Sequence, residues 1–265
     1  MNSPTTLTGK RIAVLAADGV EQAELQQSVA ALQAAGADVA IVAPRSGRIR
    51  SMQVHQPGEL VKVDQALGQA NAADYDGLLV PGGYISPDSL RQSSAARDLL
   101  RQMHGLGKPV ALLSQAPLLL VSSGLACRRV LTSWPGIRDD MVNAGATWLN
   151  RPVVRDGPYL CGRGAQDLAA FVASLPSFFA GEADTAANPP PAQSDPPQEA
   201  PSEAPDQPLR WLSAPSVGAM LSLALLGVGV VAVNQGRRRR RTAGAGDVPP
   251  PDALPAPPAS SDLPG

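Results

Sequence analysis

The chain has 265 residues, a formal net charge of −1 at pH 7 and an aromatic content of only 3%. A near-zero charge provides no global field to attract nucleic acid, and so few aromatic residues disfavour a base-stacking surface. The two cysteines, Cys127 and Cys161, favour neither a disulfide framework nor a zinc site. We therefore expect no nucleic-acid partner, no metal and no cofactor.

The composition changes sharply along the chain. Residues 10–181 mix apolar runs, glycines and scattered charges, whereas the chain from Glu182 onward is mostly Pro, Ala, Ser, Gln, Asp and Glu. About 170 residues are enough for one well-formed core. The predicted organisation is a globular domain (1–181), a proline-rich acidic linker (182–209), an apolar helix (210–235), and an arginine cluster with a disordered tail (236–265).

In chain order, short apolar runs that end in turn residues alternate with segments of helical period. The predicted strands span residues 11–16, 38–43, 75–80 and 109–113, with short strands at 146–148, 153–154 and 159–161. The predicted helices span residues 21–35, 93–104, 116–123, 137–144 and 165–179. This alternation implies right-handed crossovers and a mainly parallel sheet with helices on both faces, an α/β domain.

Ligands of such sheets bind at the carboxyl ends of the strands. Three predicted loops meet that description, at residues 18–21, 81–84 and 114–117. The residue pattern alone therefore predicts a crevice formed by these three loops.

Four segments carry a family resemblance, in this order: residues 20–25 (VEQAEL), 76–83 (DGLLVPGG), 107–111 (GKPVA) and 132–145 (TSWPGIRDDMVNAG). Together they resemble the PfpI branch of the DJ-1/PfpI superfamily, over roughly residues 10–180. The resemblance implies a flavodoxin-like three-layer sandwich related to class I glutamine amidotransferases. Members are described as intracellular proteases, deglycases, glyoxalases or stress chaperones, and they commonly assemble as homodimers or higher oligomers.

In that family the fourth strand ends in a sharp elbow that reads Cys-His-Gly-Pro. Here Ser114, Gln115 and Ala116 occupy the Cys, His and Gly positions. The resemblance also matches Glu21 to the glutamate that hydrogen-bonds the thiol. It matches Gly82 and Gly83 to the loop that supplies backbone donors for an oxyanion. Asp88 resembles an acidic residue that in some members reaches the elbow of a neighbouring subunit.

These departures weaken the chemistry expected of the family. A serine hydroxyl is a poor nucleophile unless a neighbour accepts its proton, and Gln115 cannot act as a base. Ser114 before a helix with an early proline also has the pattern of a helix N-cap, and Glu21 also suits a helix N-terminus.

Two classes of function therefore stay open. We favour a degenerate member that acts as a binding, chaperone-like or scaffold domain, with a small-molecule ligand possible. The alternative is an enzyme that uses Ser114, Glu21 and the glycine loop on a small carbonyl, ester or amide. Among the remaining candidates, His104 is interpreted as a helix-end residue, and both cysteines are interpreted as small buried side chains. His55 is assigned no role.

Residues 214–233 carry no charge and have the length that a bilayer-spanning helix needs. Trp211 precedes them at an interfacial position, and residues 237–241 are five arginines suited to lipid headgroups, so residues 214–241 are expected to contact membrane lipids. The arginines favour a cytoplasmic tail and an external domain. The polar start of the sequence, with no signal peptide apparent, favours a cytoplasmic domain on a single-pass C-terminal anchor, the orientation we prefer. A misassigned start codon that hides a signal is the rival explanation.

Overall fold

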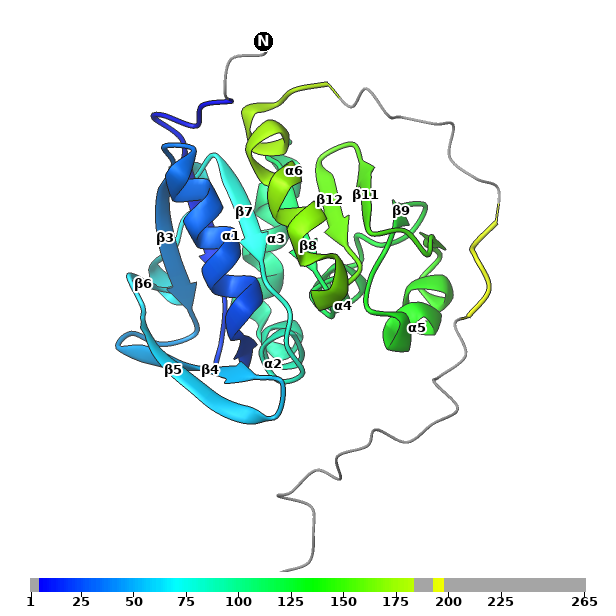
Figure 1. Cartoon of the computed structure of the whole chain (residues 1–265), viewed down its shortest axis with the longest axis horizontal. Helices are drawn as coiled ribbons and strands as arrows, with labels where there is room; N and C mark the ends of the chain where they lie inside the picture. The colour runs from blue at the N-terminus through cyan, green and yellow to red at the C-terminus, as the bar shows by residue number, and fades with distance from the viewer. Residues whose placement is uncertain (1–4, 184–192, 198–265) are drawn as a thin grey trace, which may run out of the picture. The chain divides into compact units, whose positions relative to one another are not determined.

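The computed structural model describes residues 5–183 and 193–197 of the chain (Figure 1). Its central sheet has seven strands in the order β11-β12-β8-β7-β1-β3-β6. These strands are β11 (Val153–Asp156), β12 (Tyr159–Gly162), β8 (Val110–Leu113), β7 (Gly77–Val80), β1 (Arg11–Leu15), β3 (Asp38–Ala43) and β6 (Gln65–Ala66). Every neighbouring pair is parallel except β11 with β12. The mainly parallel sheet predicted from the sequence is confirmed.

Helices cover both faces of this sheet. The α-helices are α1 (Gln22–Ala34), α2 (Ser86–Gln92), α3 (Ser94–Gly105), α4 (Leu118–Ser122), α5 (Arg138–Asn143) and α6 (Leu168–Ala180). Short 3₁₀ helices lie at η1 (Leu67–Gln69), η2 (Ala72–Asp74), η3 (Pro135–Ile137) and η4 (Ala165–Asp167). Side chains of α1 and α6 pack on one face of the sheet, and side chains of α2, α3 and α4 pack on the other.

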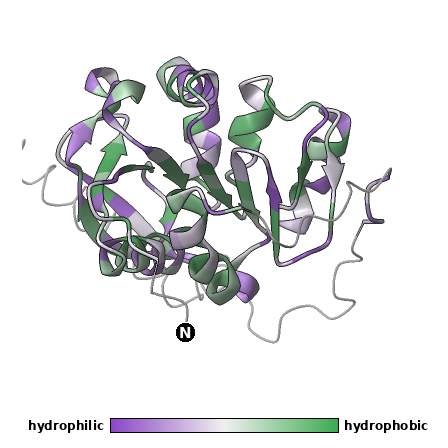
Figure 2. Cartoon of the chain, turned by 90° about the horizontal axis from the view of Figure 1, so that it is seen from above, coloured by the Kyte–Doolittle hydropathy of each residue, from purple (hydrophilic) through white to green (hydrophobic). Residues whose placement is uncertain are grey.

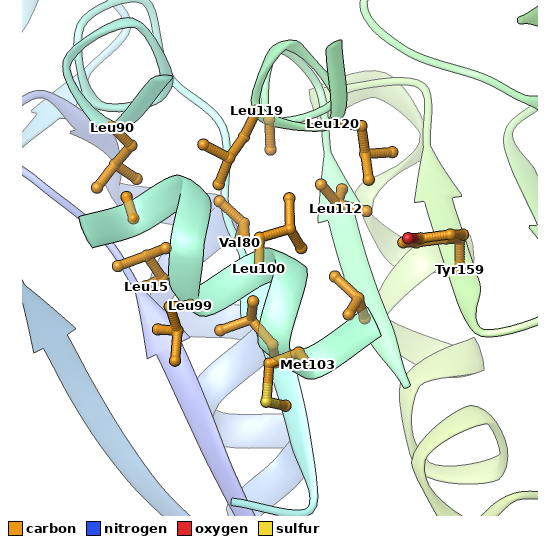
Figure 3. Packing of buried hydrophobic residues seen from close by; sticks show 14 of the residues in the cluster. Leu15, Val80, Leu90, Leu99, Leu100, Met103, Leu112, Leu119, Leu120 and Tyr159 are labelled. Carbon is orange, nitrogen blue, oxygen red and sulfur yellow. The ribbon is translucent and has the colours of Figure 1, made fainter. Parts of the chain in front are cut away.

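The two cores follow from the alternation of side chains along a strand. In β1, Ala13 and Leu15 face α3, whereas Ile12 and Val14 face α1 and α6. Figure 3 shows the first core, where Leu15, Val80 and Leu112 of the strands meet leucines of α2, α3 and α4. Figure 2 shows the same pattern as hydrophobic central strands, with hydrophilic residues on the outer surfaces of the helices. Strands apolar on both faces read as continuous apolar runs, which is why they could be located from the sequence.

Two small sheets were not predicted. The hairpin of β4 (Arg48–Gln53) and β5 (Gln56–Lys62) joins β2 (Val20–Glu21) in a three-stranded sheet. A second, parallel pair joins β9 (Val130–Leu131) to β10 (Thr147–Trp148). The hairpin turn places Val54 at φ +56°, where Gly, Asn or Asp is the usual choice. The sequence therefore lacks the turn signal that would have marked it.

The predicted membrane anchor, the arginine cluster and most of the predicted linker lie outside the described residues. Within the described part, the helices are all too short or too polar to cross a bilayer.

Candidate functional site

The predicted crevice loops come together at the carboxyl ends of β1, β7 and β8. A Cβ atom added to Gly82, after β7, would lie 2.6 Å from the Ser114 Cβ, after β8. A Cβ atom added to Gly83 would lie 2.5 Å from the carbonyl oxygen of Gly19, after β1. Only glycine allows three chain segments to approach so closely, so the glycine pair is what closes this corner of the sheet.

Ser114 occupies a strained elbow between β8 and α4. Its φ is +55°, an unfavourable value for a residue that has a side chain, and the residue is only 3% exposed. Its N–H donates to Gly162 of β12 (3.0 Å), and its carbonyl accepts from the Trp134 N–H (2.9 Å). The predicted N-cap role is wrong, because α4 begins at Leu118 and Pro117 is the residue before it.

Glu24 of α1 is the carboxyl group in contact with Ser114. The Ser114 hydroxyl donates to Glu24 Oε1, and Glu24 Oε2 accepts from the Gly82 N–H at 2.7 Å. The side chain is 2% exposed, and this burial raises its pKa to about 7, against the lowering effect of the two hydrogen bonds. The negative charge of Glu21 adds a smaller upward contribution. The carboxyl group therefore changes its charge near neutral pH.

Glu21, the carboxylate matched from the resemblance, does not contact Ser114. Its Oε2 accepts from the Val54 N–H (3.1 Å), and its own N–H donates to the Gly82 carbonyl (3.1 Å). Helix α1 starts one residue after it, which leaves Glu21 in extended backbone outside the helix. Both glutamates belong to the same matched segment, and only Glu24 lies on the buried stripe of α1 with Leu25 and Ser28. That stripe was the signal that could have identified it.

Gln115, at the position of the family's histidine, points at the glycine loop. Its Oε1 accepts from the Gly83 N–H at 3.2 Å, and the residue is 9% exposed. With Glu24 on the Gly82 N–H, both glycine amides donate to side chains of the protein itself. The neighbouring Ala116 is fully buried and donates its N–H to Leu113 (3.0 Å). An oxyanion could use these glycine donors only by displacing Gln115 or Glu24.

A second side of the site comes from two segments that follow in the sequence. A Cβ atom added to Gly164, just after β12, would lie 3.6 Å from the Ser114 hydroxyl oxygen and 3.2 Å from Cε3 of Trp134. Trp134 and Gly164 therefore lie beside the Ser114 hydroxyl. Sequence analysis did not single out either residue, although Trp134 falls within a matched segment.

The other candidates lie apart from the Ser114–Glu24 contact or make different ones. Asp88 is exposed on α2 and accepts from Gln92 Nε2 at 3.0 Å. His104 lies within α3 as expected, and its Nδ1 pairs with the Tyr159 hydroxyl at 2.8 Å. His55 stacks on Tyr84 with ring centroids 5.9 Å apart, which places it beside the residue that follows the glycine pair.

The two cysteines differ in exposure. Cys161 is buried as expected, and burial raises the pKa of its thiol to about 12. The expectation of burial is wrong for Cys127, which is exposed. Over residues 5–183 and 193–197, His, Cys, Asp and Glu nowhere gather in a group of three or more that could ligate a metal.

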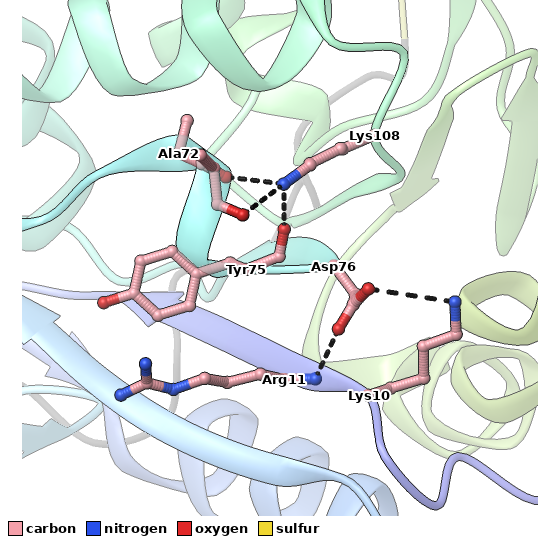
Figure 4. Close-up of polar contacts among 7 residues, drawn as sticks. Lys10, Arg11, Ala72, Tyr75, Asp76 and Lys108 are labelled. Carbon is pink, nitrogen blue, oxygen red and sulfur yellow. Dashed lines mark hydrogen bonds and ion pairs between the residues drawn. The ribbon is translucent and has the colours of Figure 1, made fainter.

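The opposite edge of the sheet, where the amino ends of β1, β7 and β8 lie, has a different polar cluster (Figure 4). There Asp76 accepts from the Arg11 N–H (2.8 Å) and lies 3.9 Å from Lys10 Nζ, while Lys108 Nζ donates to backbone carbonyls that include Ala72 (2.7 Å). A cavity of about 460 Å³ opens beside it, and Lys10, Asp76 and Phe178 are among its lining residues. These groups lie where β1, β7 and β8 begin, away from the Ser114 elbow.

Comparisons with known proteins agree with this geometry. The model of the DJ-1/PfpI family matches residues 10–176. Deglycase PfpI of Pyrococcus furiosus is 36% identical over 162 residues, which cover 61% of this chain and 95% of the relative. Protein/nucleic acid deglycase 2 of Escherichia coli is 32% identical over 163 residues, or 61% and 93% of the two chains. The crystal structure of Drosophila melanogaster DJ-1beta superposes with a TM-score of 0.60 at 27% identity, covering 65% of this chain and 91% of that one.

Proposed function

Because the chain belongs to the DJ-1/PfpI family, whose members similar to it include deglycases, we propose that it is a degenerate member of that family. In this proposal the domain keeps the fold and the carboxyl–glycine corner but lacks cysteine-dependent hydrolase or deglycase activity. It acts as a binding, stress-related or scaffold module, and a small molecule is the ligand that the site would accept.

The observation that carries the proposal is that both backbone N–H groups of the glycine loop already have hydrogen-bond acceptors within the protein. Gln115 accepts the Gly83 N–H and Glu24 accepts the Gly82 N–H, so the donors that would stabilise an oxyanion are paired within the protein. Position 114 supplies a hydroxyl in place of a thiol, and position 115 supplies an amide in place of an imidazole. A nucleophile and its base act as a unit, so the loss of either one alone removes most of the catalytic rate.

One observation favours the alternative of an enzyme with altered chemistry. Ser114 lies in a strained elbow and donates its hydroxyl hydrogen bond to Glu24, whose pKa of about 7 is suited to a general base at neutral pH. The base in this alternative is Glu24, in the place first assigned to Glu21. The substrate would be a small carbonyl, ester or amide.

Activity measurements separate the two functions. We expect a protein ending at residue 200 to consume no methylglyoxal and to cleave neither peptides nor activated esters above the rate of its Ser114→Ala variant. The double variant Ser114→Cys, Gln115→His tests whether the rest of the site is competent. Activity gained by that variant alone would locate the loss at these two positions.

A serine enzyme would behave differently in the same assays. Wild-type turnover would disappear in Ser114→Ala, fall about 10²–10⁴-fold in Glu24→Gln, and rise with pH through about 7 as Glu24 ionises. Such a profile would replace the degenerate assignment with the alternative. Glu21→Gln is the matched control, since Glu21 lies outside contact with Ser114 and should leave the rate within a few-fold.

We further propose that residues 214–233 attach the protein to a membrane, with the arginines at residues 237–241 among lipid headgroups. The absence of charge over those residues supports the proposal. Fractionation of the full chain beside a version ending at residue 209 tests it. Recovery of the full chain in the soluble fraction would refute it, and protease treatment of intact spheroplasts would decide whether the domain faces the cytoplasm, the side we favour.

Self-association is the remaining proposal about partners. Its support is a set of exposed apolar side chains beside the glycine loop: Val54, Tyr84 and Ile85 are 58%, 56% and 51% exposed. Exposed Asp88 lies on α2, the helix that follows Ile85. Light scattering of the domain at micromolar concentration tests the proposal, and a monomer would contradict it.

A further inference from the structure

The strand β10 has one edge that β9 does not use. The N–H groups of Thr147 and Leu149 point toward β9 and donate to Arg129 (2.8 Å) and Leu131 (2.8 Å). The N–H groups of Trp148 and Asn150 alternate with them and so point to the opposite side. An unpaired edge of this kind is a template for another extended segment.

A short piece of the linker lies along that edge. We call residues 193–197 the strap; in Figure 1 it is the yellow segment beside α5. Its Ser194 hydroxyl accepts from the Trp148 N–H (2.9 Å), and the Asp195 N–H donates to the Trp148 carbonyl (2.8 Å). The strap therefore pairs with both backbone groups of Trp148.

Asp195 makes two further contacts. Its carboxylate Oδ2 accepts from the Asn150 N–H at 2.7 Å, and its carbonyl accepts from Arg138 Nε of α5 at 2.9 Å. With the strap in place the Arg138 side chain is only 15% exposed, and its guanidinium also pairs with Asp139 at 2.5 Å. One residue of the strap thus satisfies three donors or acceptors of the domain. A carboxylate acceptor makes the Asn150 contact charge-assisted.

The sequence on either side limits the pairing to this point. Pro196 and Pro197 have no N–H group, so the strap cannot continue as a regular strand after Asp195. Residues 189–191 are also prolines. Ser194 and Asp195 are thus a recognition element in a sequence that otherwise avoids strand pairing.

We propose that the edge formed by Arg138 and residues 148–150 is a docking site for the Ser194–Asp195 element of the chain's own linker. The edge lies within the region shared with relatives, whereas the Ser194–Asp195 element lies beyond it, because the family match ends at residue 176. Docking fixes residues 194 and 195 of the linker to the domain beside α5. A matching acidic Ser-Asp-Pro segment is the chemistry that this edge recognises.

Two hydrogen bonds connect the docking site to the Ser114 elbow. The Trp148 indole Nε1 donates to the Ser133 hydroxyl (3.0 Å), and the following residue, Trp134, donates its N–H to the Ser114 carbonyl (2.9 Å). The strap therefore bonds to Trp148, whose indole bonds to Ser133, the residue before Trp134 of the candidate site.

Amide hydrogen exchange of the full chain in detergent micelles tests the proposal. Residues 147–150 provide an internal control, because two of their N–H groups donate to the strap and the other two donate to residues 129 and 131. In Ser194→Ala, Asp195→Ala, exchange at Trp148 and Asn150 should accelerate by about tenfold or more, since each loses one acceptor. Exchange at Thr147 and Leu149, which donate to β9, should stay within about twofold of wild type. Gln193→Ala, on an exposed strap residue, is the matched control and should change none of the four amides.

Two results would overturn the proposal. One is wild-type exchange at Trp148 and Asn150 that already equals that of the double variant, which would mean that the strap is not docked in solution. The other is an equal acceleration at all four amides, which would make the strap part of the folding of the β9–β10 pair. Asp195→Asn, which keeps a side-chain acceptor, should retain most of the protection at Asn150.

Discussion

At the carboxyl ends of β7 and β8, Glu24 and Ser114 are almost fully buried and bonded to each other, whereas Lys10 and Asp76 at the amino ends are nearly half exposed. Both edges gather polar groups from segments distant in sequence. At the exposed edge, water screens the ions, and the pair contributes little. At the buried edge, removal from water raises the pKa of Glu24 to about 7. Burial of polar groups, more than their number, is what distinguishes the candidate site.

The polar groups of the amino edge bond mainly to the backbone. The Asp76 carboxylate accepts from the first N–H of β1, and Lys108 donates to carbonyls of η2 and of Tyr75. These contacts satisfy backbone groups that the sheet leaves unpaired at its start. At the carboxyl edge, the backbone N–H groups of Gly82 and Gly83 donate to the buried side chains of Glu24 and Gln115. We therefore place function at the carboxyl edge and chain closure at the amino edge.

The largest expected effect is on the pH dependence of stability at Glu24. Because its folded pKa of about 7 exceeds the ordinary 4.5, the folded protein binds the extra proton, and its stabilising contribution is full below about pH 4.5 and is lost as pH rises to about 7. Glu24→Gln should remove this dependence, worth on the order of 3 kcal/mol. Urea unfolding between pH 4.5 and 8 measures it. Glu21→Gln should keep most of the wild-type dependence, because Glu21 makes only the smallest contribution to the Glu24 pKa. Equal curves for wild type and Glu24→Gln would contradict the buried-carboxyl assignment.

A slightly smaller loss of folding stability is expected when a side chain is added at Gly82. In Gly82→Ala the new methyl would lie 2.6 Å from the Ser114 Cβ and 2.9 Å from the Leu113 carbonyl oxygen, so the elbow must shift at a cost of about 2–3 kcal/mol. Gly105→Ala at the end of α3 meets no atom within 4 Å and should be neutral or slightly stabilising. Denaturant midpoints of the two variants give the contrast, and a neutral Gly82→Ala would show that the corner is less tightly packed than described.

The smallest effect is expected at the amino edge. Asp76→Ala removes the acceptor of the Arg11 N–H and the pair with Lys10, at a cost of about 1 kcal/mol in the free energy of unfolding. Asp76→Asn keeps an acceptor and isolates the ion pair, for which a loss of at most about 0.5 kcal/mol is expected. A larger loss in Asp76→Asn would mean that the two edges differ less than we infer.

The order of the main elements could be read from the sequence because buried parallel strands are continuous apolar runs. The hairpin of β4 and β5 could not, since its strands are largely exposed and are joined through Val54 in a conformation that valine rarely adopts. The resemblance located the elbow at Ser114 and the glycine pair correctly in space. It assigned the contact with the residue at position 114 to Glu21, whereas the structure gives that contact to Glu24, which lies on the buried face of α1.

The docked strap illustrates another limit of sequence reasoning. Residues 182–209 are rich in proline and acidic residues, the composition of a spacer that makes no contacts. Ser194 and Asp195 differ from their surroundings only in matching an edge that forms when β9 and β10 pair. Composition describes the average of a segment, whereas docking depends on two residues and on a surface built elsewhere in the chain.

The crowding at Gly82 also limits which substitutions this part of the fold can accept. A carboxyl group from α1, a glycine amide after β7 and a small side chain after β8 share a space in which one added methyl does not fit. We expect selection for folding to retain Gly82 and a small residue at position 114, because a larger side chain at either position would displace the elbow. A variant with a thiol at position 114 would find the carboxyl group and the glycine loop already assembled around it.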